Sequence, residues 1–175
     1  QCTSIQASSC ISTAVLGCAM GSVFIGILSD RLKNRKYVQS VTGIIYATMW
    51  FVLLLGLRSV TIFWMYLVMF LLGFCSCAYA VCWSCVKEYN DPAYAGISTS
   101  IANMGGYLGS IVVPALASGI YTGARKSETE AMAFGKVILM AAAVNILGVI
   151  ISFSVKETRG ENIWELEEKI FPSQR

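Results

Sequence analysis

Five long runs of uncharged, mostly apolar residues divide the chain, and short charged segments separate them. A helix that rises about 1.5 Å per residue needs about 20 apolar residues to cross the hydrocarbon core of a bilayer. Each run is long enough, so we predict an all-α polytopic membrane protein, with a transmembrane bundle over residues 1–155 and a tail over residues 156–175. The predicted spans cover residues 9–29, 37–57, 61–84, 93–120 and 134–155.

The basic residues of the charged segments predict the orientation of the chain, because cytoplasmic loops of membrane proteins carry an excess of Lys and Arg. The segment after the first run carries four basic residues against one acidic residue, Asp30. We therefore place this segment in the cytoplasm, the N-terminal end of the chain outside and the tail inside. The cytoplasmic segments then hold Arg31, Lys33, Arg35, Lys36, Lys87, Lys156, Arg159, Lys169 and Arg175, and the outer ones hold Arg58, Arg125, Lys126 and Lys136.

The composition excludes several classes of protein. Hydrophobic residues make up 56% of the 175 residues and charged ones 13%, with a mean hydropathy of +0.65, which is far from a soluble globular domain. No basic face or aromatic platform indicates nucleic-acid binding. The chain has no His, and the apolar runs have no Asp or Glu, so the residues that intramembrane aspartyl and serine proteases need are absent. We expect neither an enzyme nor a cofactor.

The chain has seven cysteines, a number that could indicate disulfide or metal chemistry. Most of them lie inside apolar runs, where a free Cys behaves as a small hydrophobic residue, so we interpret them as buried thiols. Cys82 and Cys85 form a C-x-x-C pair, which leaves a zinc or redox site as the alternative.

Local patterns predict how some of the helices begin, pack and end. Gly17 and Gly21 lie four residues apart on one face of the first predicted helix, a spacing that lets a second helix approach closely. The third run, residues 59–86, is longer than a span needs, so we expect it to tilt or to project beyond the membrane. Asp91 can cap a helix whose first residue is Pro92.

Four residues form a candidate substrate cavity. Ser100, Asn103 and Tyr107 follow one another at spacings of three and four, so they share one face of the fourth predicted helix. The amide of Asn103 needs partners at membrane depth, either on another helix or on a substrate, and both remain open. Tyr79 in the third run must also satisfy its hydroxyl group, with ordinary packing as its alternative.

The segment between the first two runs resembles a known family signature. Gly26, Leu28, Asp30, Arg31 and Arg35, followed by Lys36, are similar to the G-x-L-x-D-R-x-G-R-R/K motif of the major facilitator superfamily. Lys33 stands where that family favours Gly, and Asn34 where it favours Arg.

Two later segments resemble the same family. The segment Lys87–Pro92, with Asn103-Met-Gly-Gly106, is similar to a loop and span of bacterial facilitator-superfamily carriers, including organic-anion carriers. The tail segment Lys156–Trp164 resembles the E-T-x-G ending of many members. Beyond Asn162, apolar residues at spacings of three and four among glutamates predict a short amphipathic helix.

The resemblance implies spans eight to twelve of a twelve-span secondary carrier in a bacterial inner (plasma) membrane. The chain starts without Met, so we expect a fragment whose partners are the lipid bilayer, the N-terminal half of the same carrier and a small-molecule substrate. The carrier would work by alternating access, and the loop resemblance favours a small organic anion. The alternative is a membrane sensor or assembly protein that keeps the fold and does not transport.

The resemblance also implies a mechanical role for the motif. It makes Gly26, Asp30, Arg31, Arg35 and Lys36 a gating motif that holds the cytoplasmic side closed. Asp30 would be the acceptor, Arg31 and Arg35 its charged partners, and Gly26 a point of close packing.

Overall fold

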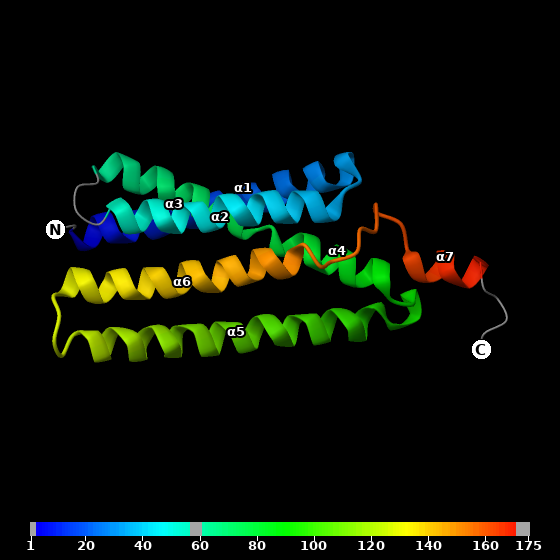
Figure 1. The fold of residues 1–175 in the computed structure, drawn as a ribbon. Coiled ribbons are helices and arrows are strands. Elements are labelled where there is room, and N and C mark those ends of the chain that lie inside the picture. The colour runs from blue at the N-terminus through cyan, green and yellow to red at the C-terminus, as the bar shows by residue number, and fades with distance from the viewer. Residues whose placement is uncertain (1–2, 57–60, 171–175) are drawn as a thin grey trace.

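The computed structural model describes residues 3–56 and 61–170, and these residues form helices without any strand (Figure 1). Five helical segments are long and apolar enough to cross a membrane, which confirms the predicted all-α polytopic class. The fourth segment starts with a short 3-10 turn, η1, and the third is divided into α3 and α4. The elements are α1 (Ser4–Leu32), α2 (Arg35–Gly56), α3 (Ile62–Ser76), α4 (Tyr79–Tyr89), η1 (Pro92–Tyr94), α5 (Ala95–Ala124), α6 (Glu130–Ser152) and α7 (Ile163–Ile170).

The first helix starts five residues before the predicted span, at Ser4. Thr3 and Gln6 form a capping box, in which each side chain accepts a hydrogen bond from the other residue's backbone N–H. Residues 4–8, which precede the first apolar run, are therefore part of the helix. The cap, which depends on polar side chains and not on hydropathy, explains the difference.

The turn between α1 and α2 is shorter than the charged segment suggests, because Arg35 and Lys36 already belong to α2. Lys33 ends α1 in the left-handed conformation with φ of 44°. Glycine adopts this conformation without steric cost, which agrees with the family's preference for Gly at this position. Asn34 then caps α2 by accepting a hydrogen bond from the N–H of Tyr37 at 2.8 Å.

Backbone contact joins α1 to α3, as the spacing of Gly17 and Gly21 predicts. A Cβ atom added at Gly17 or Gly21 would collide with the carbonyl oxygens of Phe70 and Phe74 in α3. Gly73 repeats the arrangement from the other helix, because a Cβ atom there would collide with the carbonyl oxygen of Ala14. This close contact between α1 and α3, which we call the seam, is therefore possible only because both helices carry glycine, which has no side chain, where they meet.

The third span is broken, which the sequence analysis did not predict. The helix stops at Ser76 and resumes at Tyr79, and the N–H of Ala78 donates to the carbonyl of Cys75 at 3.2 Å in a tighter turn. Cys77 is only 1% exposed at this break and packs in the core cluster with Ile25, Val38, Val81 and Cys85. By contrast, α5 runs unbroken through Pro114.

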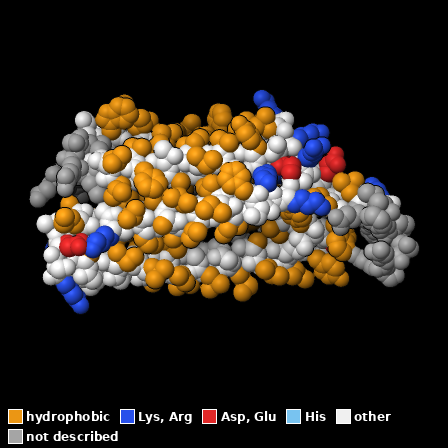
Figure 2. All heavy atoms as spheres, in the orientation of Figure 1, with side chains coloured by type: hydrophobic (Ala, Val, Ile, Leu, Met, Phe, Trp, Pro, Cys, Tyr) orange, Lys and Arg blue, Asp and Glu red, His pale blue; other side chains and the backbone are white. Residues whose placement is uncertain are grey.

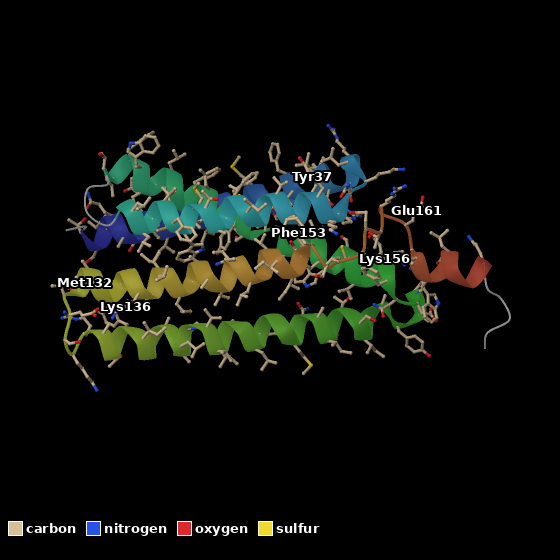
Figure 3. The ribbon with its side chains drawn as sticks, in the orientation of Figure 1. Tyr37, Met132, Lys136, Phe153, Lys156 and Glu161 are labelled. Carbon is tan, nitrogen blue, oxygen red and sulfur yellow. The ribbon has the colours of Figure 1, made fainter. Side chains whose placement is uncertain are left out.

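The last two long helices form one side of the bundle. Figure 1 shows α6 between α2 and α5, with α5 at the edge. The predicted cap before α5 is present, since Asp91 accepts the N–H of Ala93 at 2.9 Å and Pro92 is the first residue of η1. Figure 3 shows Lys136 near the end of the bundle where α5 turns into α6 and Lys156 toward the opposite end, in the segment after α6. The tail forms the predicted amphipathic helix, α7.

Candidate functional site

Figure 2 shows the larger group of charged side chains at one end of the bundle and a smaller group, which includes the Lys136–Glu128 ion pair, at the opposite end. The end with the larger group, which we call the charged end, holds the α1–α2 turn, the α4–α5 turn and the segment after α6. Segments far apart in the sequence meet here through hydrogen bonds. The bonds that centre on Arg35, Glu88 and Glu157 also involve Ser29, Asp30, Lys36 and Thr158.

Arg35, in the first turn of α2, is the centre of the charged end. Its Nη1 donates to Asp30 Oδ1 at 2.5 Å and to Ser29 Oγ at 3.0 Å. Its Nε and Nη2 both donate to Glu88 Oε1, at 3.2 and 2.9 Å. The side chains of Arg35 and Glu88 are 11% and 14% exposed, whereas that of Asp30 is 68% exposed. Of the two acidic partners of Arg35, Glu88 is therefore the one sheltered from solvent, and solvent screens the contact with Asp30 more strongly.

Glu157 caps α2 from the other end of the sequence. Its carboxylate accepts the backbone N–H of Arg35 at 2.9 Å and of Lys36 at 2.7 Å, at the positive end of the α2 dipole. It also accepts the N–H of Arg159 at 2.8 Å. Partial burial favours the neutral acid, but these N–H donors outweigh it and lower the pKa of Glu157 below its ordinary value.

Further contacts bind the segment after α6 to the end of α4. Thr158 donates a hydrogen bond to the second carboxylate oxygen of Glu88, and the hydroxyl group of Tyr89 donates to the carbonyl of Lys156. Asn162 donates to the carbonyls of Lys87 and Asn90, each at 3.3 Å. The charged end is thus a continuous hydrogen-bonded network through three segments of the chain.

The network contains only part of the predicted gating motif. Asp30 pairs with Arg35 as expected, while Arg31 is exposed and Lys36 contributes its backbone N–H. A Cβ atom at Gly26 would meet nothing within 4 Å in the described chain, so the close packing expected there is not made by these helices. Sequence analysis did not single out Glu88 or Glu157 as site residues, although both lie in segments that resemble the family.

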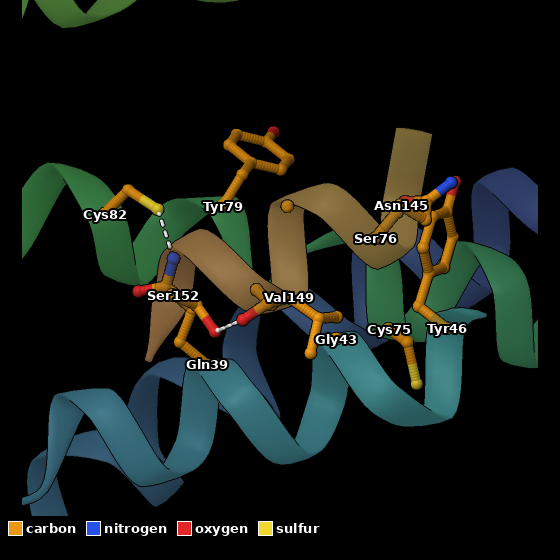
Figure 4. Close-up of a pocket in the computed structure, with 12 residues that line it drawn as sticks. Gln39, Gly43, Tyr46, Cys75, Ser76, Tyr79, Cys82, Asn145, Val149 and Ser152 are labelled. Carbon is orange, nitrogen blue, oxygen red and sulfur yellow. Dashed lines mark hydrogen bonds between the residues drawn. The ribbon is translucent and has the colours of Figure 1, made fainter. Parts of the chain in front are cut away.

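A cavity of about 290 Å³ lies between α2, the α3–α4 break and α6 (Figure 4). Tyr79 lines this cavity beside Gln39, whose Nε2 donates to Cys82 Sγ at 3.0 Å. None of the described residues that line the cavity is charged, so it offers amide, hydroxyl and thiol groups within an apolar wall. The other lining residues are Gly43, Tyr46, Cys75, Ser76, Ala78, Asn145, Gly148, Val149 and Ser152.

The other predicted cavity residues do not reach this cavity. Ser100, Asn103 and Tyr107 lie on α5, and Tyr107 is 71% exposed. The hydroxyl group of Ser100 donates to the carbonyl of Gly96 in its own helix at 2.9 Å. The structure therefore separates the four predicted residues into Tyr79 at the cavity and three residues along α5.

The two cysteines of the C-x-x-C pair lie in different surroundings. Cys82 lines the cavity, whereas Cys85 is buried in the core cluster. Within residues 3–56 and 61–170, no group of three or more His, Cys, Asp or Glu residues is placed to hold a metal ion.

Comparison with known proteins identifies the family. The sequence model of the Major Facilitator Superfamily matches residues 2–174. Searches of curated proteins and of solved structures each found no match. Nearly the whole chain is matched, and the five candidate spans and the charged turn after the first of them agree with it. The chain belongs to the Major Facilitator Superfamily and is an integral membrane protein of the transporter class.

Proposed function

We propose that the chain is the C-terminal part of a secondary carrier that moves a small solute, with an organic anion as the favoured class, by alternating access. Family membership supports transport in general. The anion is favoured by the resemblance of residues 87–106 to organic-anion carriers. The anion's charge would be met in the other half of the carrier, because the cavity beside Tyr79 has no basic residue.

The observation that carries the proposal is the network around Arg35. Its contacts join α1, α2, the end of α4 and the segment after α6. A network of this kind makes one end of the bundle move as a unit, which rocking of one bundle against another requires. We propose that the charged end is cytoplasmic and that this unit closes the cytoplasmic side against the other half of the carrier until substrate binding shifts the carrier to its other state.

The proposed substrate contacts form two groups. Tyr79 contacts the cavity between α2, the α3–α4 break and α6, while Ser100, Asn103 and Tyr107 present polar groups along α5. Tyr107 is exposed in this chain, which suits a surface that faces the other half of the carrier. When the carrier changes state, α5 would then expose these polar groups to the substrate.

The test is solute flux in proteoliposomes made with the full-length protein that contains this chain. A panel of labelled small organic anions and neutral solutes is offered with and without unlabelled solute inside the vesicles. We expect saturable uptake of at least one anion, accelerated by the same anion on the opposite side. A solute that binds but does not cross the membrane would contradict the proposal and favour a sensor.

An Arg35→Gln variant tests the role of the network in the same vesicles, with Lys33→Gln as the matched control. Both changes remove one positive charge at or next to the α1–α2 turn, but only Arg35 makes the network contacts. We expect uptake to fall in Arg35→Gln and to stay near wild type in Lys33→Gln. Equal uptake in the two variants would contradict the proposed gate.

A further inference from the structure

Two cysteines from different helices meet at the break in the third span. The Sγ atoms of Cys18 in α1 and Cys77 between α3 and α4 are 3.1 Å apart. The Cys77 thiol donates to the carbonyl oxygen of Cys18 at 3.0 Å, which holds the sulfur against α1. A disulfide needs an S–S distance of about 2.05 Å, so closing the bond requires the two sulfurs to move together by about 1 Å.

The surrounding backbone keeps the two thiols together. Gly17 precedes Cys18 and brings α1 into backbone contact with Phe70, while Gly73 on α3 contacts Ala14. The two helices therefore cannot separate at this level without losing their seam. The backbone contact between α1 and α3 therefore holds the two sulfurs near each other, and their pairing does not depend on flexible side chains alone.

The two thiols differ in access, which assigns them different roles. Cys18 is partly exposed, whereas Cys77 is 1% exposed in the core cluster. An oxidant can reach Cys18 first, and Cys77 needs only to meet Cys18. Cysteines that respond to oxidation commonly pair an accessible thiol with a neighbouring resolving thiol in this way.

We propose that Cys18 and Cys77 form a redox-active dithiol, which an organic hydroperoxide dissolved in the bilayer converts to a disulfide that fixes the α3–α4 break against α1. The Cys18 sulfur attacks the peroxide, the O–O bond breaks, and an alcohol leaves while Cys18 becomes a sulfenic acid. The Cys77 sulfur then attacks Cys18, the S–O bond breaks and the S–S bond forms, and the thiol proton leaves with the hydroxide as water. Two thiols and one hydroperoxide thus give one disulfide, one alcohol and one water.

The position of Cys77 gives the bond a consequence for the helix. Between α3 and α4 the third span makes tighter backbone hydrogen bonds in place of the regular α-helical ones, so α3 and α4 can change their relative direction there. A covalent bond from this point to α1 removes that freedom. If the chain is part of a carrier, as proposed above, oxidation will slow transport.

The test uses the full-length protein in proteoliposomes treated with cumene hydroperoxide, or with cumyl alcohol as the control. Remaining thiols are alkylated, the protein is digested without reduction, and the peptides are identified by mass spectrometry. We expect a linked pair of peptides that contains Cys18 and Cys77. Its mass should be two hydrogen atoms below the sum of the two separate peptides, and dithiothreitol should separate the pair. Both thiols still alkylated after peroxide, or Cys18 oxidised to sulfinic acid without a link, would overturn the proposal.

Variants separate the pair from the other cysteines and from misfolding. Cys18→Ala changes the partly exposed partner, and Cys10→Ala on the same helix is the matched control that keeps the pair. We expect the link to be lost in the first variant and kept in the second. Phenylarsine oxide binds two neighbouring thiols at once. We expect it to protect Cys18 of the wild type from peroxide, and we expect an added dithiol to remove it. If phenylarsine oxide also protected Cys77 from peroxide in Cys18→Ala, Cys77 would have a different partner and the proposed pair would be wrong.

Transport is measured in the same vesicles, so the chemical result stands apart from the functional one. We expect peroxide to reduce uptake in wild type and in Cys10→Ala, dithiothreitol to restore it, and Cys18→Ala to keep its uptake. A linked pair with unchanged uptake would overturn the effect on the helix break. A linked pair in a protein that moves no solute would instead contradict the proposed function and leave the dithiol assignment in place.

Discussion

The carboxylate of Glu157 accepts the backbone N–H of Arg35, although 122 residues separate the two in the sequence. The contact ties the segment after α6 to the N-terminus of α2, where the helix dipole favours a negative charge. The Arg35 side chain then continues the link to Glu88 and Asp30. One residue therefore joins the family-like motif to both other segments of the charged end.

Replacing Glu157 with Gln should destabilise the protein, because Gln cannot offer a charged acceptor to two N–H groups of α2. We expect a loss of about 1–2 kcal/mol, typical of a charge-assisted hydrogen bond at a helix N-terminus. Thermal unfolding in detergent measures it, with Glu161→Gln as the control at an exposed position of the same segment. Equal midpoints for the two variants would contradict the capping role.

The Glu157 contribution should depend on pH in a definite direction. Its pKa is lower in the folded protein than the ordinary value of 4.5, so the carboxylate stabilises the folded state fully above that pH. The contribution is lost as the pH falls through the lower, folded pKa. The difference in unfolding midpoint between wild type and Glu157→Gln should therefore be constant near neutral pH and shrink below about pH 4.5. A difference that grows on acidification would show that another group is responsible.

Glu88 and Arg35 should be energetically coupled, since two Arg35 nitrogens donate to one Glu88 oxygen in a sheltered site. Either single change, Glu88→Gln or Arg35→Gln, leaves one charge without this partner and should cost about 3 kcal/mol. The double variant should cost less than the sum of the two. A double-mutant cycle on unfolding free energy measures the difference, and an additive result would contradict the pairing.

If the charged end closes the carrier, as proposed above, Asp30→Asn should shift the carrier toward the state that is open at this end, because the change weakens one of the contacts of Arg35. The Cys82 thiol lines the cavity, so we use its reaction rate to follow the proposed opening. We expect faster alkylation of Cys82 by a water-soluble maleimide added at the charged end, together with a changed uptake rate. The Lys33→Gln variant is the control, and unchanged rates of both processes in Asp30→Asn would count against the gate.

Gly73→Ala should disrupt the seam between α1 and α3, because the new methyl group would collide with the backbone oxygen of Ala14. Backbone cannot move aside as a side chain can, so we expect a loss of about 1–3 kcal/mol or more and poor recovery of folded protein. Gly119→Ala in α5 meets nothing within 4 Å in the described chain and is the matched control. Similar unfolding midpoints for the two variants would show that the seam tolerates a side chain.

Tyr79→Phe should weaken substrate binding if the cavity between α2, the α3–α4 break and α6 contacts the solute. Removal of one hydrogen bond of about 1 kcal/mol corresponds to a rise of about fivefold in KM. Tyr94→Phe is the control, because Tyr94 lies in η1 away from this cavity and is 60% exposed. A KM that is unchanged in Tyr79→Phe would remove Tyr79 from the substrate contacts.

Sequence alone determined the class of this protein. Its uncharged runs are long enough to cross a bilayer. Within lipid the backbone of such runs must form its hydrogen bonds inside helices, so the runs predict membrane-spanning helices. The Gly17 and Gly21 spacing and the Asp91–Pro92 cap were also readable, since each depends on residues a few positions apart. The family motif identified Asp30 and Arg35 as residues of interest before any contact was known.

Tertiary structure decided which residues meet. The partners of Arg35 come from positions 88 and 157, and no local rule relates such distant positions. The break between α3 and α4 occurs within an uninterrupted apolar run without Gly or Pro at the break, so neither hydropathy nor turn chemistry marks it. The meeting of Cys18 and Cys77 depends in turn on that break and on the α1–α3 seam. Local physics fixes helices from neighbouring residues, whereas the networks between helices exist only once packing has placed their ends together.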